Sequence, residues 1–547
     1  MTDKIQAQEH SKTLKDLTPR QQQILQLMQQ GKVNKDIARE LGISIGTVKQ
    51  HLVSIFKKLD VKNRTMAVAR LAGFKDQEGD QSFHGETLMA MRPCIVLSVK
   101  LNGRFTRTVL KFFHTCLSEK AFDCNALFIS LEPGEGDLIF GLKRSSEQDM
   151  RMATLVASHL YEVMTDYVSD EYQQTDDSII KGALVAGLVR VSQNRFGGWS
   201  GENVGSHVLA WGHELRDAAA PGCLFLDQPV KGVMQAFDLT MSNDLPEQVR
   251  FTELVRLNAW NSPDASPLVG RDEELMIIRQ LLDGQYRILL LEGENGMGKS
   301  RLCREAGRCA EASHISLLYI RVLPTGFLDC ADYRHFDHWK DVESLVRERS
   351  VQLMIVEDAH HFSVEGKADI TAFINRLTMP VQVLVSGRQP LDFSLDCSVE
   401  LHVKRLHLQR LSESDLVVFF DQEDVSRDVL ERCRGIPLFA RELSLGKANT
   451  ISLAMLITVA SRIDKFKVDW KLLYCVAAHE SAVSVERLSE LMQDSEAYIE
   501  SALKRAEKLG VLSINDRLAS FKHPLVKDVV HYLFKPHSPS IAASRYS

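Results

Sequence analysis

The chain of 547 residues has a formal net charge of −6, with 44% apolar and 25% charged residues, which is typical of a folded globular protein and not of a disordered one. No apolar stretch approaches the roughly 18 residues of a membrane span, and the first residues lack the apolar core of a signal peptide. The ten cysteines form no CxxC pair, which argues against a zinc site or a disulfide framework. We therefore expect a cytoplasmic protein of about three or four domains with no membrane partner.

Residues 17–75 predict a compact helical unit. Thr18, followed by a proline, is typical of a helix start, and the apolar stripe of that helix ends at Gly31. Asn34 and Ser44 are placed to cap a second and a third helix, separated by a short turn. This spacing indicates a helix-turn-helix, in which the later helix enters the major groove of DNA.

The charge of this unit supports contact with nucleic acid. Residues 17–75 contain 11 Lys or Arg and 3 Asp or Glu, a net charge of +8, so the remainder of the chain carries −14. A basic module on an acidic chain is the electrostatic pattern expected for phosphate binding. Charge alone leaves open a helical bundle whose basic face is simply solvated.

The order of residues in LTPRQQQIL, NKDIARELGIS, GTVKQHL and IFKKLDVKNRT resembles the LuxR-type helix-turn-helix. In that family the third helix reads bases, and lysines near its end hold phosphate. The resemblance implies double-stranded DNA as a partner, with base-edge contacts from Lys49, Gln50 and Val53. It implies contacts to the DNA backbone from Asn34, Lys35, Thr47, Lys57 and Lys58.

Residues 92–250 alternate strand-like and helix-like patterns. Apolar runs at 95–99, 126–130 and 137–140 predict strands, and a helical pattern at 145–164 precedes a further strand at 183–192. Strands interleaved with helices indicate an α/β or α+β sandwich.

Two segments of this region, GEGDLIFGLKRSSEQDMRMATLVASHLYEV and WSGENVGSHVLAWGHELRDAAAPGCLFLDQPV, resemble class III nucleotide cyclases. The resemblance places the first of two metal-binding aspartates at Lys100 and the second at Asp137. The asparagine and arginine that steady the transition state fall at Leu209 and His213. Because a protonated lysine cannot bind magnesium and the family's chemistry needs two clamped metals, the resemblance implies a degenerate domain without cyclase activity. Dimerisation or capture of a signal would be its remaining roles.

A phosphate-binding loop is predicted further along the chain. The apolar run at 288–291 indicates a buried strand that leads into GENGMGKS, and a helix-forming stretch follows. In this pattern backbone N–H groups surround phosphates at a helix N-terminus, the lysine reaches the outer phosphates and the serine hydroxyl binds magnesium. We expect ATP or ADP with Mg²⁺ to be held by Gly293, Glu294, Asn295, Gly296, Met297, Gly298, Lys299 and Ser300.

Two later strands are predicted to deliver charged residues to the same sheet edge. The run at 351–356 ends in Glu357 and Asp358, which, with Ser300, are candidate magnesium ligands and the candidate catalytic pair. The run at 381–385 leads to Arg388, a candidate sensor of a terminal phosphate. A loop-capping role for the two carboxylates, and a purely structural role for the arginine, stay open.

Residues 267–536 resemble the STAND-type ATPases, a branch of the AAA-like group, through PLVGRDEELMIIRQLL, IVEDAHHF, CRGIPLFARELSL and a winged-helix-like segment at 502–534. The resemblance implies that Pro437 lies near the base and that His523 holds bound ADP. Glu357 stands where the family has aspartate, so which carboxylate binds magnesium is left open. His360 and His361 are interpreted as packing or capping residues.

The predicted fold is multidomain: an all-α helix-turn-helix, an α+β cyclase-like domain, and an α/β P-loop ATPase with a C-terminal helical and winged-helix-like part. The expected boundaries are a polar tail 1–16, the helix-turn-helix 17–75, a linker 76–91, the cyclase-like domain 92–250, a linker 251–266, the ATPase domain 267–445, the helical and winged-helix part 446–536 and a tail 537–547.

The combination predicts an ATP-binding transcriptional regulator whose nucleotide state, ATP or ADP, controls assembly and DNA occupancy. We expect at most slow ATP hydrolysis, a homo-oligomer in the active form and an inducer of unknown identity. One alternative is an active nucleotide cyclase with regulatory ends, and another is a signalling scaffold whose basic module binds protein.

Overall fold

The computed structural model describes residues 18–29, 37, 41, 47–48, 51–52, 54–55, 89–172, 179–193, 199–237, 245–254, 268–323, 328–330, 335–336, 339–362, 364–376, 381–388, 391, 393, 403–420, 427–444, 451–465 and 468–534. The chain divides into two compact units, Met1–Glu86 and Thr87–Ser547. In the described residues no helix is long and apolar enough to cross a membrane.

In the first unit, helix α2 (Pro19–Gln29) begins as predicted, at Thr18. The backbone N–H of Gln21 donates to Thr18 Oγ1 (3.3 Å), and the N–H of Thr18 donates to Gln21 Oε1 (3.1 Å), a reciprocal capping box. Apolar residues of the predicted helices are buried at Ile24, Leu25, Leu27, Ile37, Val48, Leu52 and Ile55, and Leu41 is half-buried. Gln21 Nε2 also donates to Ser54 Oγ (2.9 Å), which ties α2 to the later helical residues.

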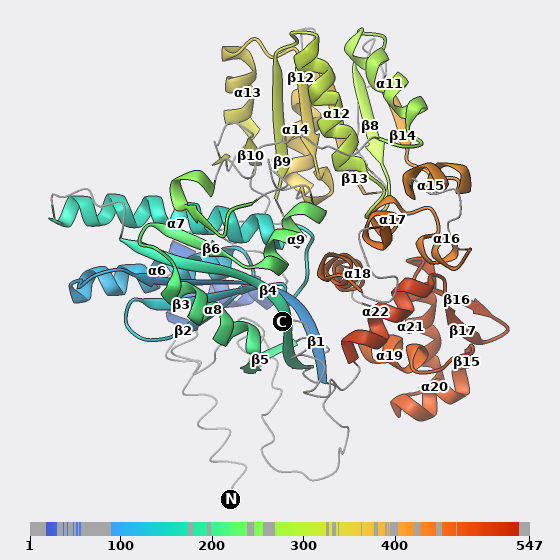
Figure 1. Cartoon of the computed structure of the whole chain (residues 1–547), viewed down its shortest axis with the longest axis horizontal. Coiled ribbons are helices and arrows are strands. Elements are labelled where there is room, and N and C mark those ends of the chain that lie inside the picture. Colours follow the sequence, from blue (N-terminus) through green and yellow to red (C-terminus); the bar gives the residue numbers. More distant parts are fainter. Residues whose placement is uncertain are drawn as a thin grey trace, which may run out of the picture. The chain divides into compact units, whose positions relative to one another are not determined.

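The second unit starts with a mixed sheet at residues 89–254, called here the middle segment (Figure 1). Its sheet order is β2-β3-β1-β4-β6-β7, with β5 paired to β4. The first six elements run β1-α6-β2-β3-α7-β4, the split βαβ arrangement, with β1 antiparallel to both β3 and β4. The elements are β1 (Met89–Leu101), α6 (Arg107–Asp123), β2 (Leu127–Ser130), β3 (Glu135–Phe140), α7 (Asp149–Tyr172), β4 (Ile180–Gln193), β5 (Trp199–Gly205), α8 (His207–Ala218), β6 (Cys223–Leu226), α9 (Gln228–Ala236), β7 (Gln248–Arg250) and the 3₁₀ turn η1 (Phe251–Glu253).

Residues 268–407, called here the P-loop segment, form a second sheet of order β11-β10-β9-β12-β13-β8-β14. The five strands β9, β12, β13, β8 and β14 are parallel, so their carboxyl ends meet at one edge, where α/β proteins bind ligands. The elements are α11 (Asp272–Leu282), β8 (Ile288–Glu292), α12 (Lys299–Ala312), β9 (Leu317–Val322), β10 (Leu328–Cys330), β11 (His335–Phe336), α13 (Trp339–Glu348), β12 (Leu353–Glu357), the 3₁₀ turn η2 (Ala359–His361), α14 (Val364–Arg376), β13 (Gln382–Gly387) and β14 (Val403–His407).

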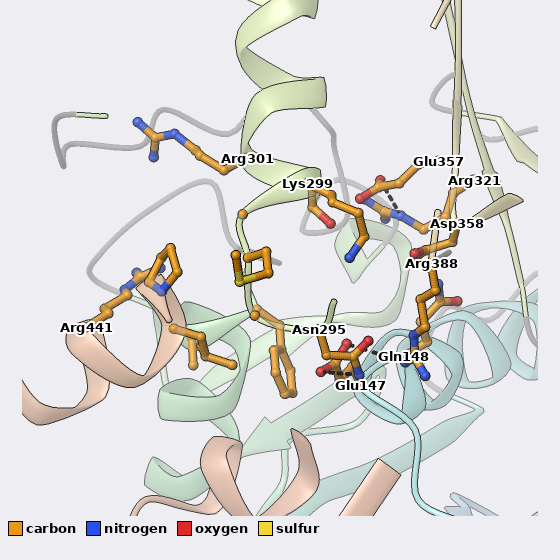
Figure 2. A pocket seen from close by; sticks show the side chains of 18 of the residues that line it. Glu147, Gln148, Asn295, Lys299, Arg301, Arg321, Glu357, Asp358, Arg388 and Arg441 are labelled. Carbon is orange, nitrogen blue, oxygen red and sulfur yellow. Dashed lines mark hydrogen bonds and ion pairs between the residues drawn. The ribbon is translucent and has the colours of Figure 1, made fainter. Parts of the chain in front are cut away.

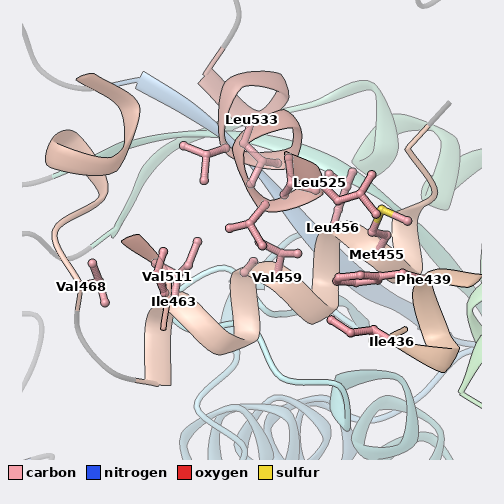
Figure 3. Close-up of a cluster of buried hydrophobic side chains, with 14 of the residues drawn as sticks. Ile436, Phe439, Met455, Leu456, Val459, Ile463, Val468, Val511, Leu525 and Leu533 are labelled. Carbon is pink, nitrogen blue, oxygen red and sulfur yellow. The ribbon is translucent and has the colours of Figure 1, made fainter. Parts of the chain in front are cut away.

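Residues 411–534, called here the C-terminal segment, are helical with a small three-stranded sheet of order β15-β17-β16. Apolar side chains of α18 belong to one buried cluster with Leu525 and Leu533 of α22, and Ile463 of α18 lies beside Val511 (Figure 3). The elements are α15 (Glu413–Phe420), α16 (Arg427–Cys433), α17 (Pro437–Ser444), α18 (Leu453–Lys465), α19 (Trp470–Ala477), β15 (Val483–Ser484), α20 (Val485–Met492), α21 (Glu496–Lys508), β16 (Leu512–Asn515), β17 (Leu518–Phe521) and α22 (Pro524–Phe534).

Candidate functional site: a nucleotide pocket

The predicted phosphate loop connects β8 to α12. Gly298 caps α12 with a φ of 91°, a left-handed conformation that favours glycine. A Cβ built on Gly298 meets no atom within 4 Å, so the loop is open on this side. Lys299, the first residue of α12, is buried, and its Nζ donates to the carbonyl oxygens of Gly293 (2.9 Å) and Glu294 (2.7 Å). The loop therefore presents a helix N-terminus and an ammonium group to the same space, which suits an anion.

The two predicted carboxylates lie in different environments at the end of β12. Glu357 is 1% exposed and accepts hydrogen bonds from Tyr319 Oη (3.0 Å) and Arg321 Nε (2.8 Å). Burial opposes ionisation of Glu357, but the charge of Arg321 and hydrogen bonds from Ser300 and Arg321 hold its pKa below the usual range. Glu357 is thus an ionised carboxylate next to the serine of the phosphate loop, as a magnesium ligand must be.

Asp358 has a φ of 59° and a side chain that is 21% exposed. Burial and then the adjacent charge of Glu357 raise the pKa of Asp358 to about 6. A partly accessible carboxylate whose pKa is shifted toward neutrality is suited to accept a proton from water.

These groups line one cavity of about 230 Å³ at the carboxyl edge of the parallel strands (Figure 2). Arg388, just past the end of β13, reaches the same cavity, and Pro437 at the start of α17 lines it as well. The predicted residues on the cavity wall are Asn295, Gly296, Met297, Gly298, Lys299, Ser300, Glu357, Asp358, Arg388 and Pro437. Gly293 and Glu294 lie behind the wall, as the two carbonyl acceptors of Lys299.

His523, predicted to reach bound ADP, is not among the residues that line the cavity. Its ring packs edge-on against Phe439 with centroids 5.1 Å apart. Burial and the positive charges of Arg434 and Arg410 lower the pKa of His523 to about 4, so the ring is neutral at pH 7. His360 and His361 line the cavity, with their ring centroids 4.1 Å apart and the rings tilted by 36°. The described residues contain no cluster of three or more metal-binding side chains.

The structure adds wall residues that the sequence did not predict. Arg321 lies near the carboxyl end of β9, the strand that neighbours β12, and forms an ion pair with Glu357. Arg271 donates to the carbonyl oxygens of Met297 (3.2 Å) and Gln409 (2.8 Å), which holds the phosphate loop against the stretch that follows β14. Arg321 follows the strand-like run LLYI, so its position was readable as another charged residue delivered by a strand.

The middle segment also contributes to this wall, through Ser146, Glu147, Gln148 and Arg151 near the start of α7, and through Ala236 and Phe237 at the end of α9. Polar residues ahead of a helix are usually interpreted as caps. No local pattern indicated that Ser146, Glu147, Gln148 and Arg151, more than a hundred positions before the phosphate loop, belong to its pocket.

Most of the predicted DNA-contacting residues, namely Asn34, Lys35, Lys49, Gln50, Val53, Lys57 and Lys58, lie outside the described residues. Thr47 is described, as a half-buried residue in a helix. It immediately precedes the buried Val48.

The polar cluster of the middle segment consists of side chains that contact one another. Lys100 Nζ lies 2.6 Å from Glu135 Oε1 and 3.4 Å from Asp217 Oδ1. His213 Nε2 lies 2.7 Å from Asp137 Oδ2. In the register of β1 and β3, Ser98 stands directly opposite Asp137, and Lys100 stands opposite Glu135. Neither Ser98, which faces Asp137, nor Lys100, where the resemblance placed the first metal-binding aspartate, carries a carboxylate.

Comparison with known proteins identifies two parts of the chain. Residues 15–71 match the family of bacterial regulatory proteins, luxR family, and residues 267–441 match the AAA ATPase domain. The chain is 52% identical over 60 residues to the putative HTH-type transcriptional regulator YhjB of Escherichia coli, a match that covers 11% of this chain and 30% of that protein. It is 30% identical over 175 residues to an uncharacterized protein of Rhizobium meliloti, covering 28% of this chain and 16% of that protein. The chain thus spans less than a third of these relatives.

Among solved structures, the Walker-type ATPase of Pyrococcus abyssi is similar over 49% of this chain and 99% of that chain, with 13% identity and a TM-score of 0.31. The adenylyl cyclase CyaB of P. aeruginosa is similar over 27% and 82%, with 11% identity and a TM-score of 0.23. The family matches confirm the predicted LuxR-type helix-turn-helix and the P-loop ATPase. The chain carries both in one polypeptide.

Proposed function

We propose that this protein is an ATP-binding transcriptional regulator that binds double-stranded DNA through residues 17–75. The observation that carries the proposal is the convergence of Lys299, Arg388, Glu357 and Asp358 on one cavity, in a chain whose residues 15–71 match the LuxR family. A phosphate pocket and a DNA-binding module in one chain are most simply explained by nucleotide control of a regulator.

The residues of the cavity suit a nucleotide with Mg²⁺. The N-terminus of α12 and Lys299 would hold the phosphates, and Ser300 with Glu357 would hold the metal. Mg²⁺ supplies charge neutralisation on the phosphate oxygens. Asp358 would orient the attacking water, and Pro437 would lie near the base. This assigns the metal to Glu357 and the water to Asp358, with hydrolysis slow and regulatory, as in STAND-type ATPases.

The middle segment is proposed to be a degenerate cyclase-like domain that retains a dimerisation or sensing role. Its split βαβ core supports this proposal. The contacts of Lys100 with Glu135 and of His213 with Asp137 support it as well, because they occupy the side chains at the candidate site. With Ser98 and Lys100 where a metal-binding carboxylate would be needed, incubation with ATP or GTP and Mn²⁺ should give no cyclic nucleotide.

Nucleotide state is proposed to act through assembly. A single helix-turn-helix contacts one half-site, so a monomer holds DNA weakly at physiological salt. A second unit brought within reach binds intramolecularly, which raises avidity about 10²–10⁴-fold. ADP is proposed as the resting form, and ATP with an inducer as the assembled, tightly binding form.

The test is Lys299→Ala in the full chain, with Lys504→Ala as the control, because Lys504 is an exposed lysine of α21. We expect Lys299→Ala to lose tight ATP binding by calorimetry and to lose nucleotide-dependent gene control. Weak DNA binding without nucleotide should persist. An ATP affinity of Lys299→Ala equal to that of the wild type would contradict the proposal.

A further inference from the structure

Glu147 of the middle segment lines the nucleotide pocket next to the phosphate loop. In Figure 2 it approaches the cavity together with Gln148, from the side opposite α12. Asn295 Nδ2, in the phosphate loop, donates to Glu147 Oε1 (3.0 Å). Arg388 NH2 lies 3.9 Å from Glu147 Oε2. A carboxylate from another part of the fold therefore contacts both the phosphate loop and the proposed sensor arginine.

The charge of Glu147 acts on two cations of the pocket, Lys299 and Arg388. Burial lowers the pKa of Lys299 and of Arg388, and the negative charge of Glu147 opposes that shift at each of them. Lys299 of the phosphate loop and Arg388, the proposed sensor, are two of the wall cations that could neutralise an outer phosphate. Glu147 thus already supplies part of the negative charge that a terminal phosphate would bring.

The segment that carries Glu147 is fixed on both sides. Arg151 forms a buried ion pair with Asp329 of β10, in which Nε lies 2.9 Å from Oδ2. Gln148 donates to the carboxylate of Asp358. The backbone N–H of Ser146 donates to Asp149 Oδ2 (2.7 Å), which holds the turn into α7. Glu147 is therefore presented by an anchored turn, although its own side chain remains 27% exposed.

We propose that Glu147 sets the preference of the pocket between nucleoside diphosphates and triphosphates, because its carboxylate competes with the terminal phosphate for Arg388 and Lys299. A diphosphate leaves the contacts of Glu147 in place. A triphosphate puts a like charge against Glu147 and displaces it, which loosens the turn at Ser146–Arg151 from the P-loop segment. The inference rests on the proposed function, since it needs a nucleotide in this pocket, and it names the group that distinguishes ATP from ADP.

The experiment compares the affinities of the full chain for ADP and for a non-hydrolysable ATP analogue, with Mg²⁺, by calorimetry. Glu147→Gln removes the charge and keeps the hydrogen-bond acceptor for Asn295. Glu162→Gln is the matched control, an exposed glutamate on α7, the helix that follows Glu147, about 20 Å further along. Glu147→Gln should shift the affinity ratio about tenfold toward the triphosphate, with ADP affinity changed less than about twofold. Glu162→Gln should leave the ratio unchanged.

A second readout distinguishes this role from a merely structural one. Hydrogen exchange of the backbone at 145–151 in the wild-type chain should be faster with the triphosphate analogue than with ADP. In Glu147→Gln, and in the second variant Glu147→Ala, exchange should no longer depend on which nucleotide is bound. An unchanged affinity ratio in both variants, with Lys299-dependent binding intact, would overturn the inference alone. If the wild-type chain binds neither nucleotide, or if binding ignores Lys299→Ala, the proposed function fails as well.

Discussion

The guanidinium of Arg92 on β1 forms a buried ion pair with the carboxylate of Asp464 on α18. Trp470 Nε1 (2.8 Å) and the backbone N–H of Ser145 (2.8 Å) donate to the same carboxylate. The guanidinium also lies over the ring of Trp199, 5.2 Å from its centroid. The middle and C-terminal segments therefore meet at a hydrogen-bonded charge pair, which Ser145 connects to the adjoining turn at Ser146–Arg151.

Removing one charge of this pair should destabilise the second unit. Asp464→Asn leaves the Arg92 guanidinium buried without a counter-charge, which costs about 3–5 kcal/mol. The lower urea midpoint should be visible in tryptophan fluorescence, since Trp199 and Trp470 lie at the site. The control, Asp516→Asn, lies in an exposed left-handed turn that asparagine tolerates, and it should match the wild type. Equal midpoints for the two variants would contradict a stabilising role.

The two carboxylates at the end of β12 should respond differently to neutralisation. Glu357→Gln leaves Arg321 without its charge partner and should lower stability by about 3–5 kcal/mol. Asp358→Asn keeps an acceptor for Gln148 and should fold normally, with ATP hydrolysis reduced about 10²-fold or more. Urea midpoints and phosphate release measure the two effects. A loss of stability in Asp358→Asn as large as that in Glu357→Gln would refute the division of roles.

Asp227 should give a measurable pH dependence of stability. Burial raises its pKa to about 7, even though the backbone N–H groups of Val230 and Ala186 donate to it. Between its usual pKa near 4 and about 7, the folded state holds a proton that the unfolded state releases, so stability falls as pH rises. Because asparagine does not titrate, the free energy of unfolding of Asp227→Asn should rise relative to that of the wild type, by up to about 1.4 kcal/mol per pH unit across this window. Urea midpoints at pH 4.5, 6 and 7.5 test this. A difference that stays constant with pH would show that Asp227 does not titrate there.

The DNA-binding residues expected from the sequence are of two kinds, those that contact base edges and those that contact the DNA backbone. Lys49→Ala and Gln50→Ala should each relax base preference at one position, at a cost of about 1–3 kcal/mol. Lys57→Ala should weaken binding to all sequences alike and lower the salt slope by about one. Titrations of selected and random duplexes at several salt concentrations separate the two. Equal losses on both duplexes for Gln50→Ala would reverse its assignment as a base reader.

Local patterns were sufficient to predict the parallel strands and the phosphate loop. The run at 288–291 and the sequence GENGMGKS predicted β8 and the cap of α12 without tertiary information, because strand burial and glycine conformations are local properties. The strand at 351–356 likewise placed Glu357 and Asp358 at the sheet edge.

Long-range register and packing could not be read in the same way. The pairing of β1 with β3 puts Ser98 opposite Asp137. A shift of this register by two residues keeps each side chain on the same face of the strand, so the alternation of apolar residues could not reveal the pairing. Glu147 reaches the pocket only because the middle segment packs on the P-loop segment through pairs such as Arg151–Asp329.

The central claim is that nucleotide state controls assembly and that assembly controls DNA occupancy. Its most direct test measures mass by light scattering and affinity for a duplex selected by the protein, in ATP, in ADP and without nucleotide. A dimer or larger species with tight DNA binding is expected in ATP, and a smaller, weakly binding species in ADP, with a difference of about 10²-fold or more in affinity. If nucleotide occupancy is confirmed and both mass and affinity are the same in all three conditions, the protein is not a nucleotide-controlled regulator of this kind.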